Sequence, residues 1–315
     1  GKKELEWIEE IAPPGLRLLF FGGKGGVGKT TCAAAFALAC AERRRILLLS
    51  TDPAHSVADA LEAPLGDEAR PVPGAPPGLR ARELDAQRAF AAWRARHGGE
   101  VEEAVAAFTA EDSGVGELVD LTPPGLDELL ALSTLLDTVV EGEAAYDLVI
   151  VDTAPTGHAL RLLEMPDLAL SWDRYLLSLL LKYREAVGLG SLAAELVELS
   201  RSLKRLQALL RDAQRARFLV VTRAAELPRR ETVRLLGSLR RLRVAVPAVI
   251  VNAVAPAGCA RCGGAPGEET EALQERLARE RRGRCAIMKA PAVFPPPRGV
   301  RRLADWVRSW ETATA

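Results

Sequence analysis

The chain lacks an excess of charge of either sign, and it lacks a long uncharged apolar run. Its 42 Lys and Arg residues balance its 42 Asp and Glu residues, so no strongly basic surface argues for nucleic acid as a partner. No stretch of about eighteen apolar residues is free of charge, so we expect no membrane-spanning helix. The segment Gly1 to Pro14 is charged and then marked by proline, so we expect no signal peptide there.

Cysteine and methionine are also scarce. Five cysteines among 315 residues do not make a disulfide scaffold, and they fit a reducing, cytoplasmic location. Cys32 and Cys40 lie in an alanine-rich segment, where we expect them to be small buried hydrophobic residues. The length suits one large α/β domain, spanning residues 1–315, with a helical insertion.

The most informative stretch is GGKGGVGKTT, which follows an apolar run and opens the alanine-rich segment. This order indicates a strand, a glycine loop and a helix. The spacing from Gly23 to Thr30 fits G-x-x-x-x-G-K-[ST], in which backbone N–H groups cradle phosphates. In that motif Lys29 reaches the β- and γ-phosphates and the Thr30 hydroxyl binds Mg²⁺. A second lysine, Lys24, can project away from its own nucleotide toward whatever faces the site. The predicted nucleotide-binding loop comprises Gly23, Lys24, Gly25, Gly26, Val27, Gly28, Lys29, Thr30 and Thr31.

Short apolar runs alternate with helical stretches along the chain, which predicts a doubly wound, mostly parallel α/β sheet. Two long helical regions, 85–140 and 168–211, predict an inserted all-helical subdomain. A Pro- and Gly-rich segment, 62–80, predicts a surface loop. The glycine loop occurs once, so we expect one nucleotide site. The five predicted strands are 16–21, 45–50, 146–151, 218–221 and 248–251.

Acidic residues follow two of the predicted strands. Asp52, just past the second strand, can orient an attacking water or hold a metal-bound water, although capping of the next helix is an alternative. Asp152 ends the third strand, where the acidic partner of a phosphate loop reaches Mg²⁺ directly or through water. Gly157 could sense the γ-phosphate as switch segments do. We interpret His158 as a loop hydrogen-bonding residue, with a direct catalytic role as the alternative.

These stretches resemble a known family. The loop with its extra lysine is similar to the deviant Walker A loop of the group that contains chromosome-partition ATPases, septum-placement ATPases and the nitrogenase iron protein. Asp52-Pro-Ala-His-Ser and Asp152-Thr-Ala-Pro-Thr-Gly-His resemble switch I and switch II of one branch. That branch contains the arsenite pump-driving ATPase and the ATPase that targets tail-anchored membrane proteins. The resemblance extends from Leu16 to about Trp310, and further agreeing stretches are 77–85, 124–128 and 160–166.

The resemblance implies an Mg²⁺-dependent ATPase that acts as a nucleotide-gated homodimer. Lys24 would cross the dimer interface to the partner's nucleotide, and Asp52 would polarise the hydrolytic water. Asp152 would support Mg²⁺ through water, while Lys29, Thr30 and Thr31 would bind phosphate and metal. The expected catalytic residues are therefore Asp52, Lys24 and Lys29.

The resemblance also implies a site for the base. Asn252 matches the asparagine that reads adenine, and the segment from Pro291 to Phe294 matches a loop that closes over the base. The family's usual Pro-Glu pair after the fourth strand is absent. Here Ala224-Ala225-Glu226 stands in its place, with the acid displaced by one position. A nucleoside contact by Glu226 is therefore not assigned.

Cys259 and Cys262 form the single C-x-x-C pair of the chain. One such pair supplies two thiolates, whereas structural Zn²⁺ takes four ligands, so two copies across a two-fold axis would complete the set. A redox pair or an unliganded pair is the alternative, and Cys285 is either a third ligand or a bystander. The targeting ATPase carries a similar pair in this region, which favours shared zinc.

The resemblance favours a cargo of hydrophobic membrane-protein segments, delivered to a membrane receptor or pump by a protein that is transiently at the membrane. Arsenite pump ATPases bind metalloid through cysteines in the helical region, yet no cysteine occurs between Asp85 and Arg161. The alternatives are an ATPase subunit that drives arsenite or antimonite export, and a nucleotide-gated holdase or scaffold. Only Met165 and Met288 are methionines, which argues against a methionine-rich promiscuous surface. Leucines recur at helical spacing and form a stripe that would pack either on a partner helix or on the chain's own core. The members of this leucine stripe are Leu192, Leu196, Leu199, Leu203, Leu206 and Leu210.

Overall fold

A computed structural model describes eight stretches of the chain. They are 6–52, 54, 56–85, 145–152, 204–223, 226–255, 271–275 and 285–313, and further single residues are described at 88, 91, 95, 128, 132, 157, 159, 160 and 201. The chain divides into two compact units, the first made of 1–84, 139–154 and 210–315 and the second of 85–138 and 155–209. Most of the second unit lies outside the described residues, so its all-helical character stays a prediction.

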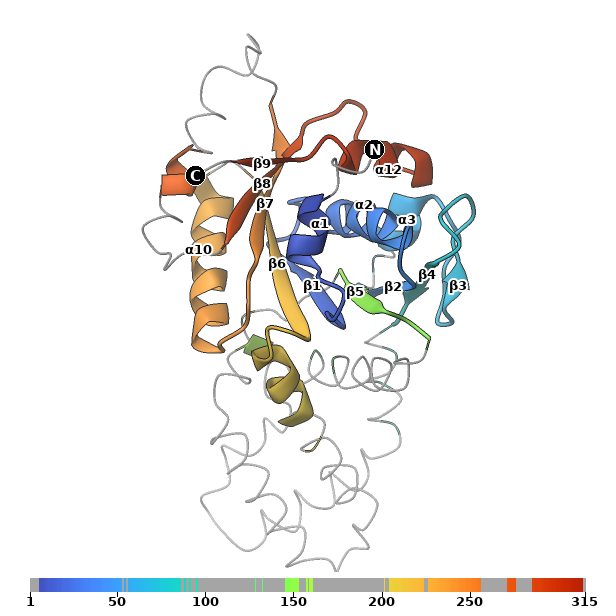
Figure 1. Ribbon diagram of the computed structural model, residues 1–315, viewed down its shortest axis with the longest axis horizontal. Coiled ribbons are helices and arrows are strands. Elements are labelled where there is room, and N and C mark those ends of the chain that lie inside the picture. Colours follow the sequence, from blue (N-terminus) through green and yellow to red (C-terminus); the bar gives the residue numbers. More distant parts are fainter. Residues whose placement is uncertain are drawn as a thin grey trace, which may run out of the picture. The chain divides into compact units, whose positions relative to one another are not determined.

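Within the described part of the first unit, nine strands form one mixed sheet in the order β3-β4-β2-β5-β1-β6-β7-β8-β9 (Figure 1). The seven inner strands run parallel, and the two short edge strands pair antiparallel to β4 and β8. This is the doubly wound, mostly parallel α/β fold that the sequence predicts. The strands are β1 (Leu18–Gly22), β2 (Ile46–Ser50), β3 (Arg70–Pro71), β4 (Leu79–Glu83), β5 (Leu148–Val151), β6 (Ala216–Arg223), β7 (Ala248–Val254), β8 (Ala286–Pro291) and β9 (Glu311–Ala313).

The central strands are buried along their whole length because their sequences are continuous apolar runs. Every residue of β1, β2 and β5 is buried. Strands covered on both faces lose the alternation of apolar and polar residues that a half-exposed strand shows. Phe20 of β1 packs on Phe218 of β6, whereas the next residue, Phe21, packs on Phe36 of a helix. Successive side chains therefore fill two separate apolar layers.

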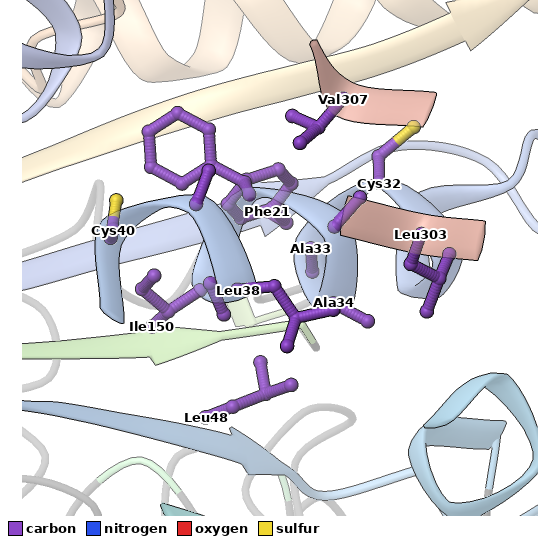
Figure 2. Close-up of a cluster of buried hydrophobic side chains, with 14 of the residues drawn as sticks. Phe21, Cys32, Ala33, Ala34, Leu38, Cys40, Leu48, Ile150, Leu303 and Val307 are labelled. Carbon is purple, nitrogen blue, oxygen red and sulfur yellow. The ribbon is translucent and has the colours of Figure 1, made fainter. Parts of the chain in front are cut away.

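The helices of the first unit include α1 (Glu6–Ile11), α2 (Lys29–Ala41), α3 (Ser56–Leu61), α10 (Glu226–Arg241) and α12 (Val300–Val307). Helix α2 contacts β1, β2 and α12, while α10 contacts β6. Alanines along α2 let it approach the sheet closely, and Leu303 and Val307 of α12 cover it from the other side (Figure 2). Cys32 and Cys40 are buried in this core, as predicted, and burial raises the pKa of the Cys40 thiol to about 12.

The five predicted strands are confirmed, with ends that differ by a few residues. The structure corrects the prediction of a plain surface loop over 62–80, because that segment contains β3 and ends inside β4. Strand β4 alternates buried Leu79 and Ala81 with exposed Arg80 and half-buried Arg82. The two arginines break the apolar run that would have marked it as a strand. Strands β8 and β9 were likewise not predicted.

Candidate functional site

The glycine loop connects the carboxyl end of β1 to the first turn of α2, as the motif predicts. Gly28 directly precedes α2 and has a φ of 87°, a left-handed conformation that favours glycine. Val27 is buried and anchors the loop, whereas Lys24, Gly25 and Gly26 are exposed at its apex. The first backbone N–H groups of a helix lack partners within it and are available to an anion. This arrangement suits a bound anion.

The side chain of Asn252, on β7, contacts the backbone of the glycine loop. Its Nδ2 donates a hydrogen bond of 2.8 Å to the backbone oxygen of Val27, and its Oδ1 accepts one from the backbone N–H of Ala253. A Cβ on Gly28 would collide with this amide, and a Cβ on Gly23 would collide with the backbone oxygen of Val221. The two glycines are therefore required by close approach to β6 and β7. At the exposed apex, by contrast, a Cβ on Gly25 or Gly26 would meet no atom within 4 Å, so there is space beside the loop for a bound phosphate.

Thr30 and Asp152 meet beside the loop. The Thr30 Oγ1 donates a hydrogen bond of 2.8 Å to Asp152 Oδ2, although the two residues are 122 positions apart. Asp152 is completely buried at the carboxyl end of β5, next to β1 in the sheet. A hydroxyl and a carboxylate are the hard oxygen donors that Mg²⁺ prefers. The residue pair therefore fits the metal that the motif predicts.

Asp52 lies in the turn between β2 and α3, on the same edge of the sheet. Its backbone N–H donates to Ser50 Oγ over 3.1 Å. One carboxylate oxygen accepts from the Ala54 N–H over 2.9 Å and the other from Ser56 Oγ over 2.8 Å. Since α3 begins at Ser56, Asp52 precedes its capping position. The carboxylate thus shapes the turn and is half-buried at the edge where ligands of such sheets bind.

The segment expected to close over the base follows β8. Pro291 ends that strand, and its backbone oxygen accepts a hydrogen bond of 3.0 Å from Trp306 Nε1. Three residues later, Phe294 is 97% exposed. An aromatic side chain this exposed has a free face for stacking. Glu226 begins α10, and its side chain is not described.

Several predicted residues lie outside the described part of the chain. They include His55 and His158 of the two switch motifs, and Cys259 and Cys262 of the C-x-x-C pair. Cys285, the proposed third thiol, is half-buried just before β8. Among the described residues, no group of three or more His, Cys, Asp or Glu could hold a metal ion. Within the described ranges, every helix is too short or too polar to span a lipid bilayer.

Sequence reasoning missed three polar residues at this edge of the sheet. Ser50, Glu83 and Thr222 are buried near the carboxyl ends of β2, β4 and β6. Each is the polar residue at or near the end of a strand, which is the signal that could have identified it. Together with Asp152, they make four of the five buried polar or charged residues in the described part of the chain.

A parallel sheet, a glycine loop leading into a helix, and a threonine–aspartate pair beside that loop define a phosphate-loop nucleoside triphosphatase. Comparison with known proteins shows which family within this class the chain resembles. A family model described as anion-transporting ATPase matches residues 16–280. The chain is 32% identical over 326 residues to ATPase GET3B of Arabidopsis thaliana, covering 95% of this chain and 79% of that protein.

Other relatives agree with this assignment. An ATPase ASNA1 homolog of Entamoeba histolytica is 31% identical over 267 residues, covering 76% of this chain and 77% of the relative. Putative arsenical pump-driving ATPase 2 of Aquifex aeolicus is 32% identical over 249 residues, covering 76% and 81%. The chain belongs to the anion-transporting ATPase family. It is an ATP hydrolase that uses ATP and Mg²⁺.

Proposed function

We propose that the chain is a nucleotide-gated homodimer that captures hydrophobic segments of tail-anchored membrane proteins and targets them to a membrane receptor. The observation that carries the ATPase part is the Thr30–Asp152 hydrogen bond beside a loop whose apex is exposed. This hydrogen bond joins residues from two segments that are distant in sequence, beside the proposed phosphate site. The cargo part rests on the switch motifs and on the relatives named GET3 and ASNA1.

Each residue of the site has a distinct task in hydrolysis. The loop N–H groups and Lys29 bind and orient the phosphates, and Thr30 and Asp152 provide oxygens at the metal position. Mg²⁺, when bound, neutralises charge on the phosphate oxygens. Asp52 accepts hydrogen bonds through both carboxylate oxygens within its turn. A shift of this turn would free an oxygen to orient the attacking water.

Lys24 is the residue that would link nucleotide binding to dimerisation. It is exposed at the apex of the loop. An ammonium in that position can reach a phosphate bound to a facing copy, where it would stabilise charge that develops on the oxygens. A lysine of each subunit would then complete the other subunit's site. Hydrolysis would remove the charge that holds the two copies together and release them.

The cargo assignment has support from the helical unit. A metalloid site needs soft ligands, and the segment between Asp85 and Arg161 has no cysteine. Two leucines of the stripe, Leu206 and Leu210, are buried. They favour packing within the chain at those two positions, and the other four members lie outside the described residues. A cargo groove would therefore use other apolar residues of the unit, such as Trp172, Tyr175, Leu176, Leu179, Leu180 and Tyr183.

Metalloid export is the second candidate function, because one relative is named a putative arsenical pump-driving ATPase.

Two measurements distinguish the candidate functions. The Asp52→Asn variant, held in MgATP, is mixed with a synthetic peptide that carries one C-terminal transmembrane segment. The targeting hypothesis predicts an isolable complex that wild-type protein releases on hydrolysis. ATP turnover stimulated by arsenite, without peptide binding, would instead support export, and peptide protection without any turnover would support a holdase.

Zinc shared between two copies is a further part of the proposal. Cys259 and Cys262 of each subunit would supply the four thiolates of one structural site. The purified dimer should therefore contain about half a zinc ion per chain by elemental analysis. A Cys259→Ser/Cys262→Ser variant should lose this zinc and weaken dimerisation, whereas Cys285→Ser should keep both. Zinc-free wild-type dimers that form normally would refute the shared site.

A further inference from the structure

Glu83 is a buried carboxylate outside the machinery described above. It is 4% exposed at the last position of β4. Burial of a carboxylate costs free energy unless hydrogen bonds compensate for lost water. A leucine would fill a similar volume without that cost. The hydrogen-bond partners of the Glu83 carboxylate therefore indicate its role.

The carboxylate binds the first turn of α3. Glu83 Oε1 accepts a hydrogen bond of 2.9 Å from the backbone N–H of Ala58, the third residue of that helix. The first N–H groups of a helix have no partner within it, and a negative charge near them is favourable. Because Glu83 is fixed in the sheet by its register with Ser50, it fixes the start of α3 relative to the end of β2.

The same helix start holds Asp52. Ser56, the first residue of α3, donates from Oγ to Asp52 Oδ2 over 2.8 Å. At the other end of the turn, Ser50 Oγ accepts the Asp52 N–H, and the Ser50 backbone oxygen accepts the Leu84 N–H over 2.8 Å. The turn that carries Asp52 is thus attached to β2 and β4 on one side and to α3 on the other.

The far end of α3 is also attached. The backbone N–H of Gly299, just before α12, donates to the backbone oxygen of Ala60 over 2.8 Å. Val57, Ala60 and Leu61 are buried in the main core. The helix is therefore held by the core and by Gly299 toward its C-terminal end, and by Glu83 at its first turn.

We propose that Glu83 is a positioning residue for ATP hydrolysis, which acts on Asp52 through the N-terminus of α3. This inference rests on the role of Asp52 given under the proposed function. It assigns no contact between Glu83 and nucleotide. Loss of the carboxylate lets the first turn of α3 move, so that Asp52 is misplaced while the phosphate loop, on β1 and α2, is unchanged.

Two substitutions test the proposal. Glu83→Leu removes the acceptor and should lower kcat about tenfold or more, since small misplacements of catalytic groups are costly. The Kd for MgATP by calorimetry should stay within about threefold, because the phosphate loop is intact. Glu83→Gln keeps an oxygen for the Ala58 N–H and should retain most of the activity. Hydrogen exchange should speed up in residues 56–61 of the Glu83→Leu variant and in few other segments.

A double variant distinguishes positioning from a general effect on stability. If Glu83 acts through Asp52, Glu83→Leu adds no further loss to the single-turnover rate of Asp52→Asn. The exposed Glu68, on the same connection between α3 and β4, provides the matched control, and Glu68→Gln should behave as wild type.

Several results would overturn the inference. They are a folded Glu83→Leu protein with wild-type kcat, equal losses of turnover and nucleotide affinity, and additive losses in the double variant. If Glu83→Leu does not fold, a Glu83→Gln protein with unchanged exchange in residues 56–61 and a kcat as low as that of Asp52→Asn contradicts it. Normal turnover by Asp52→Asn alone would first refute the proposed role of Asp52.

Discussion

At the scale of single residues, the phosphate loop depends on contacts from strands that are distant in sequence. Asn252 supports Val27 from β7, and this contact leaves no space for a Cβ on Gly28. The resemblance assigns Asn252 to adenine, whereas the structure shows its amide nitrogen bound to the loop backbone. Both tasks are compatible, because an asparagine side chain has more hydrogen-bonding capacity than the loop contact uses.

The Asn252→Ala variant separates these two tasks. Loss of the amide leaves the Val27 oxygen without its partner, which costs about 1–3 kcal/mol and loosens the loop for any nucleotide. If Asn252 also reads adenine, ATP binding should weaken more than GTP binding. Calorimetric titrations of both nucleotides measure the difference. If ATP and GTP binding weaken equally, Asn252 only supports the loop. If the binding of both nucleotides is unchanged, both tasks are refuted.

The residues of the site could be predicted to different degrees. Thr30 and Asp152 carry motif signals, and the structure joins them by a hydrogen bond. Glu83 could not be assigned, because its strand contains two arginines and its partner is a backbone N–H that no sequence pattern marks. The partners of Asp52 also depend on the fold of one turn.

At the scale of elements, parallel pairing explains why the site residues meet. Six consecutive strands, from β4 to β7 across the sheet, end at the same edge. Continuous apolar runs made β1, β2, β5, β6 and β7 predictable. Strand β8 contains Lys289 in its middle, and β3 and β9 are only two and three residues long. Short edge strands depend on pairing with a neighbour rather than on their own sequence.

The opposite ends of β2 and β5 are joined by a charged pair. The Arg45 side chain and backbone N–H donate to the Asp147 carboxylate, and the guanidinium lies 2.8 Å from it. Hydrogen bonds from the Arg45 side chain and then its backbone lower the pKa of Asp147 from 3.8 to about 2. The lowered pKa adds stability that is complete well above pH 3.8 and is lost as the pH falls through about 2.

The Asp147→Asn variant should therefore be less stable than wild type at neutral pH, and the difference should shrink in acid. The pair is partly exposed, so the effect should not exceed about 1 kcal/mol. Urea unfolding at about pH 7 and pH 3 compares the two proteins. A difference in the free energy of unfolding that is the same at both pH values would show that the ion pair does not cause it.

At the scale of the whole molecule, the proposed unit of activity is a pair of chains with a lysine exchanged between the two sites. The Lys24→Ala variant should bind MgATP as a single chain within about threefold of wild-type affinity, because Lys29 and the loop N–H groups remain. It should lose ATP-dependent dimerisation in sedimentation experiments, and turnover should fall about a hundredfold or more. Lys204→Ala, an exposed lysine outside the loop, is the control. A dimeric, fully active Lys24→Ala protein would contradict the exchange.

The hydrolytic role of Asp52 is the claim on which the nucleotide gate and the positioning role of Glu83 depend. The most direct measurement compares MgATP binding and single-turnover hydrolysis in wild type and Asp52→Asn. The substitution keeps the size of the side chain and one oxygen acceptor, so the MgATP affinity should be unchanged. Hydrolysis should slow by about a hundredfold or more, the scale of a lost general base. Hydrolysis at the wild-type rate by an Asp52→Asn protein that binds MgATP normally would show that Asp52 has no hydrolytic role.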